Sequence, residues 1–192
     1  MTKLNELLSS NKTVFTLDDL SVIWGQDKRS NTYQSAKEYA RAGKLVRLRR
    51  GLYTLPKAKP TQAEIANKLI TPSYLTGETI LKKYGLSFQI SYQVTSAALV
   101  SRKIPLDSAI YIYYQLNEEI FYNPCGVRDE GGVTAASRER AIGDLIYLYG
   151  EKNRFENLAG IDWQELEEIG KIYGKKSVIE NIKKLEKKYA GR

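Results

Sequence analysis

The sequence contains no histidine and one cysteine, and these two shortages exclude several kinds of site. Without histidine, the chain lacks both the commonest general base and the commonest metal ligand. A Ser-His-Asp triad, a Cys-His pair or a zinc site of the usual kind therefore cannot be built from it. Because Cys125 is the only cysteine, no disulfide can form within the chain, and a reducing cytoplasm is the expected location.

Long apolar runs are also missing. No segment approaches the roughly 20 apolar residues that a membrane span needs. The first ten residues, MTKLNELLSS, lack the apolar centre and the small-residue cleavage site of a secretory signal. We therefore expect no association with a membrane. A length of 192 residues with 42% hydrophobic and 27% charged residues suits a globular protein of one large domain or two small ones.

Positive charge is concentrated in the first third of the chain. The net charge is +8, and residues 1–60 hold 12 Lys and Arg against 5 Asp and Glu, a local net charge of +7. The remaining residues are nearly neutral, at +1. Such asymmetry predicts a nucleic-acid-binding module joined to an electrostatically neutral domain. A basic surface that only maintains solubility is the alternative.

Three helices and a hairpin are predicted in this basic region. Leucines at helical spacing indicate a first helix in residues 2–10, and Thr16 is a suitable N-cap for a second that Gly25 ends. A third helix is expected over residues 31–43, begun by Ser30 or Asn31. The alternating stretch KLVRLRRGLYTLP then predicts two strands joined around Arg50 and Gly51. This order is typical of a winged helix-turn-helix.

The winged-helix arrangement makes DNA the expected partner of this domain. The third helix of such a domain enters the major groove with its N-terminal residues, and the hairpin lies against phosphates. Asn31 and Gln34 can read adenine, Arg29 can read guanine, and Thr32 offers a methyl group to thymine. The candidate DNA-binding residues are Lys28, Arg29, Ser30, Asn31, Thr32, Gln34, Arg47, Arg49 and Arg50.

Two alternatives remain open for these residues. Winged helices also serve as protein-docking domains, and Arg47 can simply line a solvated strand. Ser30, Asn31 and Thr32 are equally suited to capping the third helix without touching DNA.

The rest of the chain is predicted to be α+β. Residues 1–56 form the winged helix, residues 57–60 the linker, and residues 61–192 a second domain with a small sheet and C-terminal helices. Strands are expected at 90–96, 109–116 and 118–123 because these stretches are rich in Tyr, Ile and Val. Helices are expected near 61–70, 76–84, 137–150, 162–174 and 177–192.

Chemistry is sparse in this second domain. It has no P-loop, no GxGxxG and no paired-cysteine metal pattern, so neither a cofactor nor a metal is expected. A metal-dependent nuclease would need several carboxylates converging on an ion. Their spacing does not require this, and Glu139 and Asp144 point away from each other on a helix. The candidate carboxylates are Glu78, Asp107, Asp129, Glu130, Glu139 and Asp144.

Several segments resemble AbiEi-type antitoxins and related transcriptional regulators. LVRLRRGLYTLP is similar to the end of the family's winged helix, and ANKLITPSYLTGETILKKYGL, YQVTSA and TAASRERAIGDLIYL follow in the family's order over roughly residues 14–150. Ile80, Tyr84 and Gly143 depart from the residues that are common in the family. No single motif carries the resemblance; it depends on their order and spacing.

The resemblance implies a specific role. Such antitoxins belong to type IV toxin–antitoxin systems that act in abortive phage infection. Their winged helix binds inverted repeats in the promoter of the operon and represses transcription. Their C-terminal domain counteracts a nucleotidyltransferase-like toxin without a stable direct complex. By this resemblance the protein is a double-stranded-DNA-binding antitoxin and autorepressor, not an enzyme, and a monomer or weak dimer.

Two other functions remain possible from the sequence. The second domain of a plain transcriptional regulator would sense a ligand or bind a protein. The other alternative is a metal-dependent nuclease directed to DNA by the winged helix.

Overall fold

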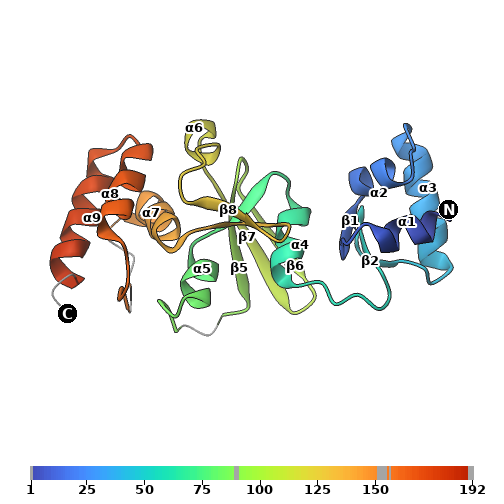
Figure 1. Cartoon of the computed structure of the whole chain (residues 1–192), viewed down its shortest axis with the longest axis horizontal. Helices are drawn as coiled ribbons and strands as arrows, with labels where there is room; N and C mark the ends of the chain where they lie inside the picture. The colour runs from blue at the N-terminus through green and yellow to red at the C-terminus, as the bar shows by residue number, and fades with distance from the viewer. Residues whose placement is uncertain (1, 89–90, 151–154, 156, 190–192) are drawn as a thin grey trace. The chain divides into compact units, whose positions relative to one another are not determined.

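The computed structural model describes residues 2–88, 91–150, 155 and 157–189. Its contacts divide the chain into two compact units, Met1–Leu69 and Ile70–Arg192, here called the N-terminal and C-terminal units. Figure 1 shows the elements of both in chain order. None of the described helices is long and apolar enough to cross a membrane.

The N-terminal unit has the element order of a winged helix. Its elements are, in chain order, α1 (Lys3–Ser9), β1 (Val14–Thr16), α2 (Leu17–Ile23), α3 (Arg29–Arg41), β2 (Val46–Arg49), β3 (Leu52–Thr54) and α4 (Gln62–Leu69). The strands pair in the order β1-β3-β2, and both pairs are antiparallel. The fold class predicted from the sequence is confirmed, with a short additional strand, β1.

The core of this unit fixes the position of α3. Ala36 of α3 packs, fully buried, into an apolar cluster with residues of α1, α2 and the sheet. The cluster also contains Trp24, whose indole nitrogen donates a hydrogen bond to the carbonyl oxygen of Lys3 at 3.1 Å. Thr16 caps α2 as predicted, in a capping box with Asp19. One face of α3 is therefore buried in this core, and the opposite face of α3 is exposed to solvent.

Helix α4 belongs to the N-terminal unit and makes polar contacts with the rest of it. The Thr13 hydroxyl donates to Glu64 at 2.6 Å, and the Lys68 ammonium lies 3.0 Å from Asp19. Asp19 also pairs with Lys12 at 2.6 Å. The boundary between the units therefore follows Leu69, later than the linker expected at residues 57–60.

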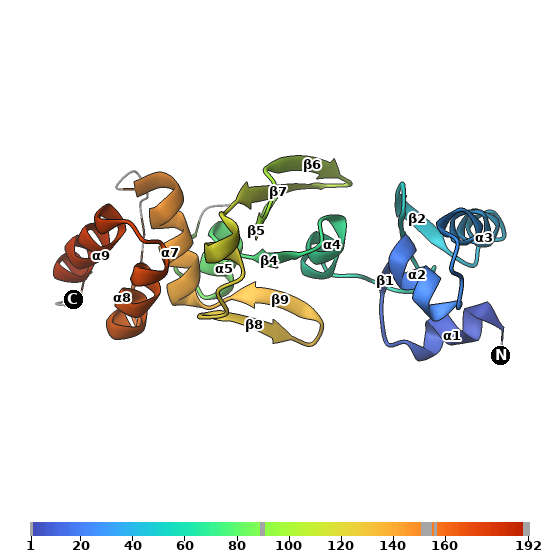
Figure 2. The same ribbon diagram turned by 90° about the horizontal axis from the view of Figure 1, so that it is seen from above.

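A mixed six-stranded sheet forms the centre of the C-terminal unit (Figure 2). Its order is β6-β7-β5-β4-β9-β8, with parallel pairing between β5 and β7 and between β4 and β9. Hairpins β6–β7 and β8–β9 form its two edges. The strands are β4 (Ser73–Leu75), β5 (Gln93–Ala98), β6 (Arg102–Leu106), β7 (Ala109–Gln115), β8 (Val127–Glu130) and β9 (Val133–Ala136).

Helices pack on this sheet and on one another. α5 (Glu78–Lys83) packs on β5, and α7 (Arg138–Tyr149) packs on α5 and β9. α8 (Trp163–Ile172) and α9 (Lys176–Tyr189) pack on α7 and on each other, while α6 (Glu118–Phe121) is a single short helix after β7.

The sequence-based elements of this unit are partly wrong. Residues 118–121 form α6 rather than a strand, because Asn117 begins a helical turn that buries Ile120 and Phe121. Strands β4, β6, β8 and β9 were not predicted. The expected starting point of a strand at Ile90 and the end of the last helix at 190–192 lie outside the described residues.

Candidate nucleic-acid interface

The N-terminal end of α3 is exposed and has no side-chain cap. Lys28 occupies the N-cap position, and no side chain bonds to the first backbone N–H groups. Ser30 and Asn31 are exposed within the first turn, so neither caps the helix. Uncapped N–H groups and the positive end of the helix dipole are features that favour an anion.

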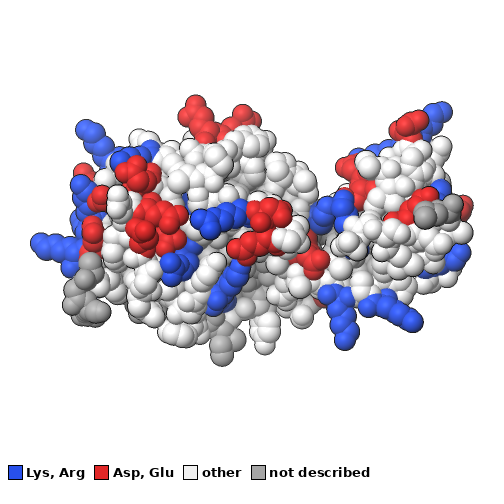
Figure 3. Space-filling view, in the orientation of Figure 1, with Lys and Arg blue, Asp and Glu red and all other residues white. Residues whose placement is uncertain are grey.

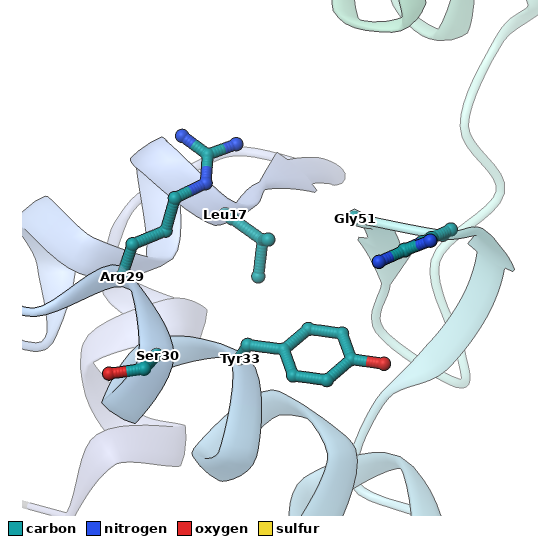
Figure 4. Close-up of a pocket in the computed structure, with 6 residues that line it drawn as sticks. Leu17, Arg29, Ser30, Tyr33 and Gly51 are labelled. Carbon is teal, nitrogen blue, oxygen red and sulfur yellow. The ribbon is translucent and has the colours of Figure 1, made fainter.

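A hollow of about 500 Å³ lies between the start of α3 and the hairpin β2–β3, which we call the wing. Arg29, Ser30 and Tyr33 line it from α3, and Arg50 and Gly51 line it from the wing. Figure 4 shows the Tyr33 ring extending from α3 toward Gly51, which lies in the turn between β2 and β3. The hollow therefore joins the two elements that were expected to contact DNA.

A second hollow of about 310 Å³ continues along the same side of α3. It shares Tyr33 with the first hollow and has Arg47 of the wing on its other side. Its lining is Tyr33, Lys37, Ala40, Arg41, Arg47 and Tyr53. Burial raises the pKa of the Tyr53 phenol, while the Arg47 charge works in the opposite direction.

The wing exposes its arginines through a bulge and a tight turn. Arg47 pairs with Tyr53 and Arg49 with the neighbouring Leu52, so a bulge lies between the two arginines, and both of them are exposed. Arg50 and Gly51 form the turn, where the backbone of Gly51 has φ +80°. Only glycine adopts this conformation without strain, which explains its place beside the arginines.

Most of the predicted DNA-binding residues lie on the surface. Lys28, Arg29, Ser30, Asn31, Gln34, Arg47, Arg49 and Arg50 are all exposed. Arg29 pairs with Asp18 at 2.7 Å, but both side chains are at least 70% exposed, so water screens this contact strongly. The exposed position of the pair leaves Arg29 able to exchange Asp18 for another partner.

Thr32 is placed differently from the other predicted residues. Its side chain is fully buried, and its hydroxyl lies 3.4 Å from the carbonyl oxygen of Lys28. It lies four residues before Ala36, which is also buried, and therefore belongs to the core face of α3. Thr32 therefore packs in the core of the unit and does not share the exposed surface of the other predicted residues.

Three residues of the hollows were not among the predicted contacts. Lys37 and Arg41 are exposed on the later turns of α3, and Tyr33 is half-buried rather than part of the core. Their spacing contains the signal that was missed. Once Thr32 and Ala36 define the buried face, positions 33, 37 and 41 fall together on the side of the helix that meets the wing.

The surface of the N-terminal unit carries Lys and Arg side chains that stand clear of it (Figure 3). Both units expose acidic as well as basic side chains in this view, but residues 1–60 carry a net charge of +7 and the rest of the chain only +1. The N-terminal unit therefore offers the better surface for a polyanion.

A buried network of charged and polar side chains lies within the C-terminal unit. Arg140 and Asp144 of α7 are 0% exposed, and the Arg140 Nε atom donates to the Asp144 carboxylate at 3.1 Å. Asp144 also accepts hydrogen bonds from Tyr74, Thr76 and Tyr173, at 3.0, 2.7 and 2.7 Å. Burial raises the pKa of Tyr74 and Tyr173, and the nearby carboxylate raises it further.

The guanidinium of Arg140 ties the network to the neighbouring loop. It donates to the backbone carbonyl oxygens of Ile120, Asn123 and Cys125, at 2.7, 3.2 and 2.9 Å. The charges of the pair are thus fully hydrogen-bonded, as a buried ion pair requires. The network joins α7 to β4, α8 and the chain after α6.

The carboxylates that were considered for a nuclease are not gathered around an ion site. Among the residues that the structure describes, no group of three or more Cys, Asp or Glu side chains could hold a metal ion. Both oxygens of Asp144 are occupied by the hydrogen bonds above. Asp107 stands at the exposed turn between β6 and β7.

Residues 3–56 match the family model described as "Transcriptional regulator, AbiEi antitoxin". The resemblance predicted from the sequence is therefore confirmed for these residues, which cover α1 to the end of the wing. The match supports a DNA-binding antitoxin or transcriptional regulator. No curated protein matches the chain.

The whole chain is similar in fold to a solved structure, the Rv2827c protein from Mycobacterium tuberculosis. The TM-score is 0.51, and the alignment covers 93% of this chain and 75% of that one. With 13% identical residues, this likeness shows the shared fold alone.

Proposed function

We propose that the protein binds the promoter of its own operon through α3 and the wing and represses transcription as an AbiEi-type antitoxin. The observation that carries this proposal is the hollow between Arg29 and Arg50, which joins the uncapped start of α3 to the wing. It lies within the residues that match the antitoxin family. In this arrangement the start of α3 reads bases in the major groove and the wing holds phosphates.

Each exposed residue has a role in the proposal. Arg29, Asn31 and Gln34 read bases, because guanidinium and amide groups can make paired hydrogen bonds with guanine and adenine edges. The phosphate contacts come from four cationic side chains and one hydroxyl group, those of Lys28, Arg47, Arg49, Arg50 and Ser30.

The antitoxin part of the proposal concerns the C-terminal unit. The partner is a nucleotidyltransferase-like toxin of a type IV system that acts in abortive phage infection, and a stable complex is not expected. The chain acts as a monomer or weak dimer on inverted repeats. The family match, which lies within the N-terminal unit, supports an antitoxin or regulator. The C-terminal unit is a separate compact unit, which leaves it available for the antitoxin role.

A binding measurement and a cell-based measurement together test the proposal. The chain is titrated onto the DNA upstream of its own gene and onto random DNA of equal length and base composition. We expect tighter binding to the upstream DNA, and repression of a reporter driven by that DNA. Equal affinity for both sequences, with no repression, would overturn the proposed regulator.

The antitoxin role needs its own readout. Co-expression with the nucleotidyltransferase-like gene adjacent to it should restore growth. A chain in which Arg49 and Arg50 are replaced by alanine should lose repression but keep this rescue. Growth inhibition that persists in the presence of the unmodified chain would contradict the antitoxin role.

A further inference from the structure

The second hollow of the N-terminal unit brings together three cations from two elements. Lys37 and Arg41 come from α3, and Arg47 comes from the wing strand β2. Among the described residues, no ion pair includes any of the three. The lining of the hollow contains no carboxylate. Within the described part of the chain, these three positive charges therefore have no acidic partner.

Other cations of the same unit are neutralised at close range. Lys12 and Lys68 both bind Asp19, at 2.6 and 3.0 Å. Lys68 thereby links α4 to α2, and Lys12 links the segment before β1 to α2. The cations of the second hollow have no such ion pair among the residues that the structure describes, so they are available to an anion from outside the chain.

The spacing of the three cations suits a chain of phosphates. Lys37 and Arg41 are four residues apart on one helix face, which places them about 6 Å apart along the axis of α3. Arg47 faces these two residues from the wing. The uncharged Ala40 and Tyr53 complete the lining of the hollow between the three cations. A concave surface lined by one sign of charge concentrates the field on an anion inside it.

We propose that Lys37, Arg41 and Arg47 clamp the sugar-phosphate backbone of DNA in this second hollow, and that Tyr33 separates it from the base-reading hollow at the start of α3. The inference rests on the proposed function, since it assigns a further part of the same interface. DNA is favoured over an acidic protein because this hollow shares Tyr33 with the hollow at the start of α3, where the proposed function places DNA. The interface then extends over the full length of α3.

The salt dependence of binding tests this clamp. In the double variant Lys37→Ala and Arg41→Ala of the full chain, the slope of log Kobs against log salt should fall by about 2, because each phosphate contact contributes about 0.9. The loss should be similar on upstream and random DNA, since phosphate contacts do not read sequence. The matched control is Lys44→Ala with Lys57→Ala. Both of these lysines are exposed in the same unit and line neither hollow.

The outcomes separate the clamp from the proposed function. A slope reduced in the Lys37/Arg41 variant and unchanged in the Lys44/Lys57 control supports the clamp. If both variants keep the slope of the unmodified chain while that chain binds DNA, the clamp is overturned and the proposed function stands. If the unmodified chain binds no DNA at about 50 mM salt, both are overturned.

A second pair of substitutions guards against loss of folding. Lys37→Gln and Arg41→Gln remove the charges but keep much of the apolar stems that pack on the helix surface. These variants should melt at the same temperature as the unmodified chain and show the same reduced slope. A normal melting temperature with an unchanged slope would overturn the clamp.

Discussion

Arginines of the wing lie exposed in the N-terminal unit, whereas Arg140 in the C-terminal unit is 0% exposed and bound to Asp144. Arg49 and Arg50 make no ion pair within the described residues, while every polar atom of the Arg140 guanidinium has an acceptor. The comparison teaches that residue type alone does not show function. Charge that is exposed and unpaired is available to a partner, and charge that is buried and fully bonded stabilises the fold.

The largest expected effect concerns the buried network. Asp144→Ala leaves Arg140 as an uncompensated buried charge and should lower the free energy of unfolding by about 3–5 kcal/mol. Replacing both residues, as Arg140→Met with Asp144→Leu, should cost less because no charge is left unpaired. Chemical denaturation of the full chain measures both. If Asp144→Ala kept its stability but lost rescue from the toxin, the network would be a functional site, and the comparison would fail.

The exposed wing arginines should affect binding and leave stability unchanged. Arg49→Ala together with Arg50→Ala should reduce the salt slope by about 2, on upstream and random DNA alike. The denaturation midpoint should equal that of the unmodified chain, because neither side chain is buried. An unchanged slope would remove the tip of the wing from the interface.

Substitutions at the start of α3 should distinguish residues that recognise bases from residues that only hold the DNA. Asn31→Ala or Gln34→Ala should each cost about 1–3 kcal/mol on the cognate sequence and less on random DNA. Thr32→Val is the matched control. Thr32 is buried, so this change should alter stability by about 1 kcal/mol or less and leave the ratio of affinities unchanged. Equal losses on both DNAs for Asn31→Ala would mean that it only positions the helix.

The smallest effect is expected at Asp19, a charged residue whose partners lie within the N-terminal unit. Burial raises the pKa of this carboxyl, but hydrogen bonds from Lys12, the Thr16 backbone and Lys68 outweigh it and hold the pKa well below the usual range. Its ionised form therefore stabilises the fold above about pH 4, the unfolded value, and this contribution is lost progressively below that pH.

The variant Asp19→Asn tests this expectation. It should lower stability at neutral pH by roughly 0.5–2 kcal/mol, the range for loss of a helix cap, and should flatten the fall in stability at acid pH. Denaturation curves between about pH 3 and pH 7 measure both effects. An unchanged acid slope would show that Asp19 does not carry this dependence.

The comparison also explains what the sequence could predict. Helices with strong caps were found, because Thr16, Ser137 and Asp162 each accept a hydrogen bond from a backbone N–H in the first turn of the helix that they begin. The wing was predicted from alternation and from Gly51. These signals are local, and the structure preserves them.

What the sequence could not predict depends on contacts between distant residues. Strand β4 has three residues and acquires its partners from β5 and β9, far along the chain. The hydrogen-bond partners of Asp144, Tyr74 and Tyr173, lie 70 and 29 residues away in the sequence. The sequence alone therefore could not show that this carboxylate is already occupied and is not a metal ligand. Tyr33 lines both hollows, and this position depends on how the wing packs against α3.

The most direct test of the account is a footprint of the full-length chain on the DNA upstream of its gene, measured over a series of salt concentrations. The account predicts a protected inverted repeat that weakens steeply with salt and disappears when Arg49 and Arg50 are replaced by alanine. The Asp144→Ala change should alter stability without changing which bases are protected. Absence of protection at low salt would contradict the account, and the exposed charges of the N-terminal unit would then require another partner.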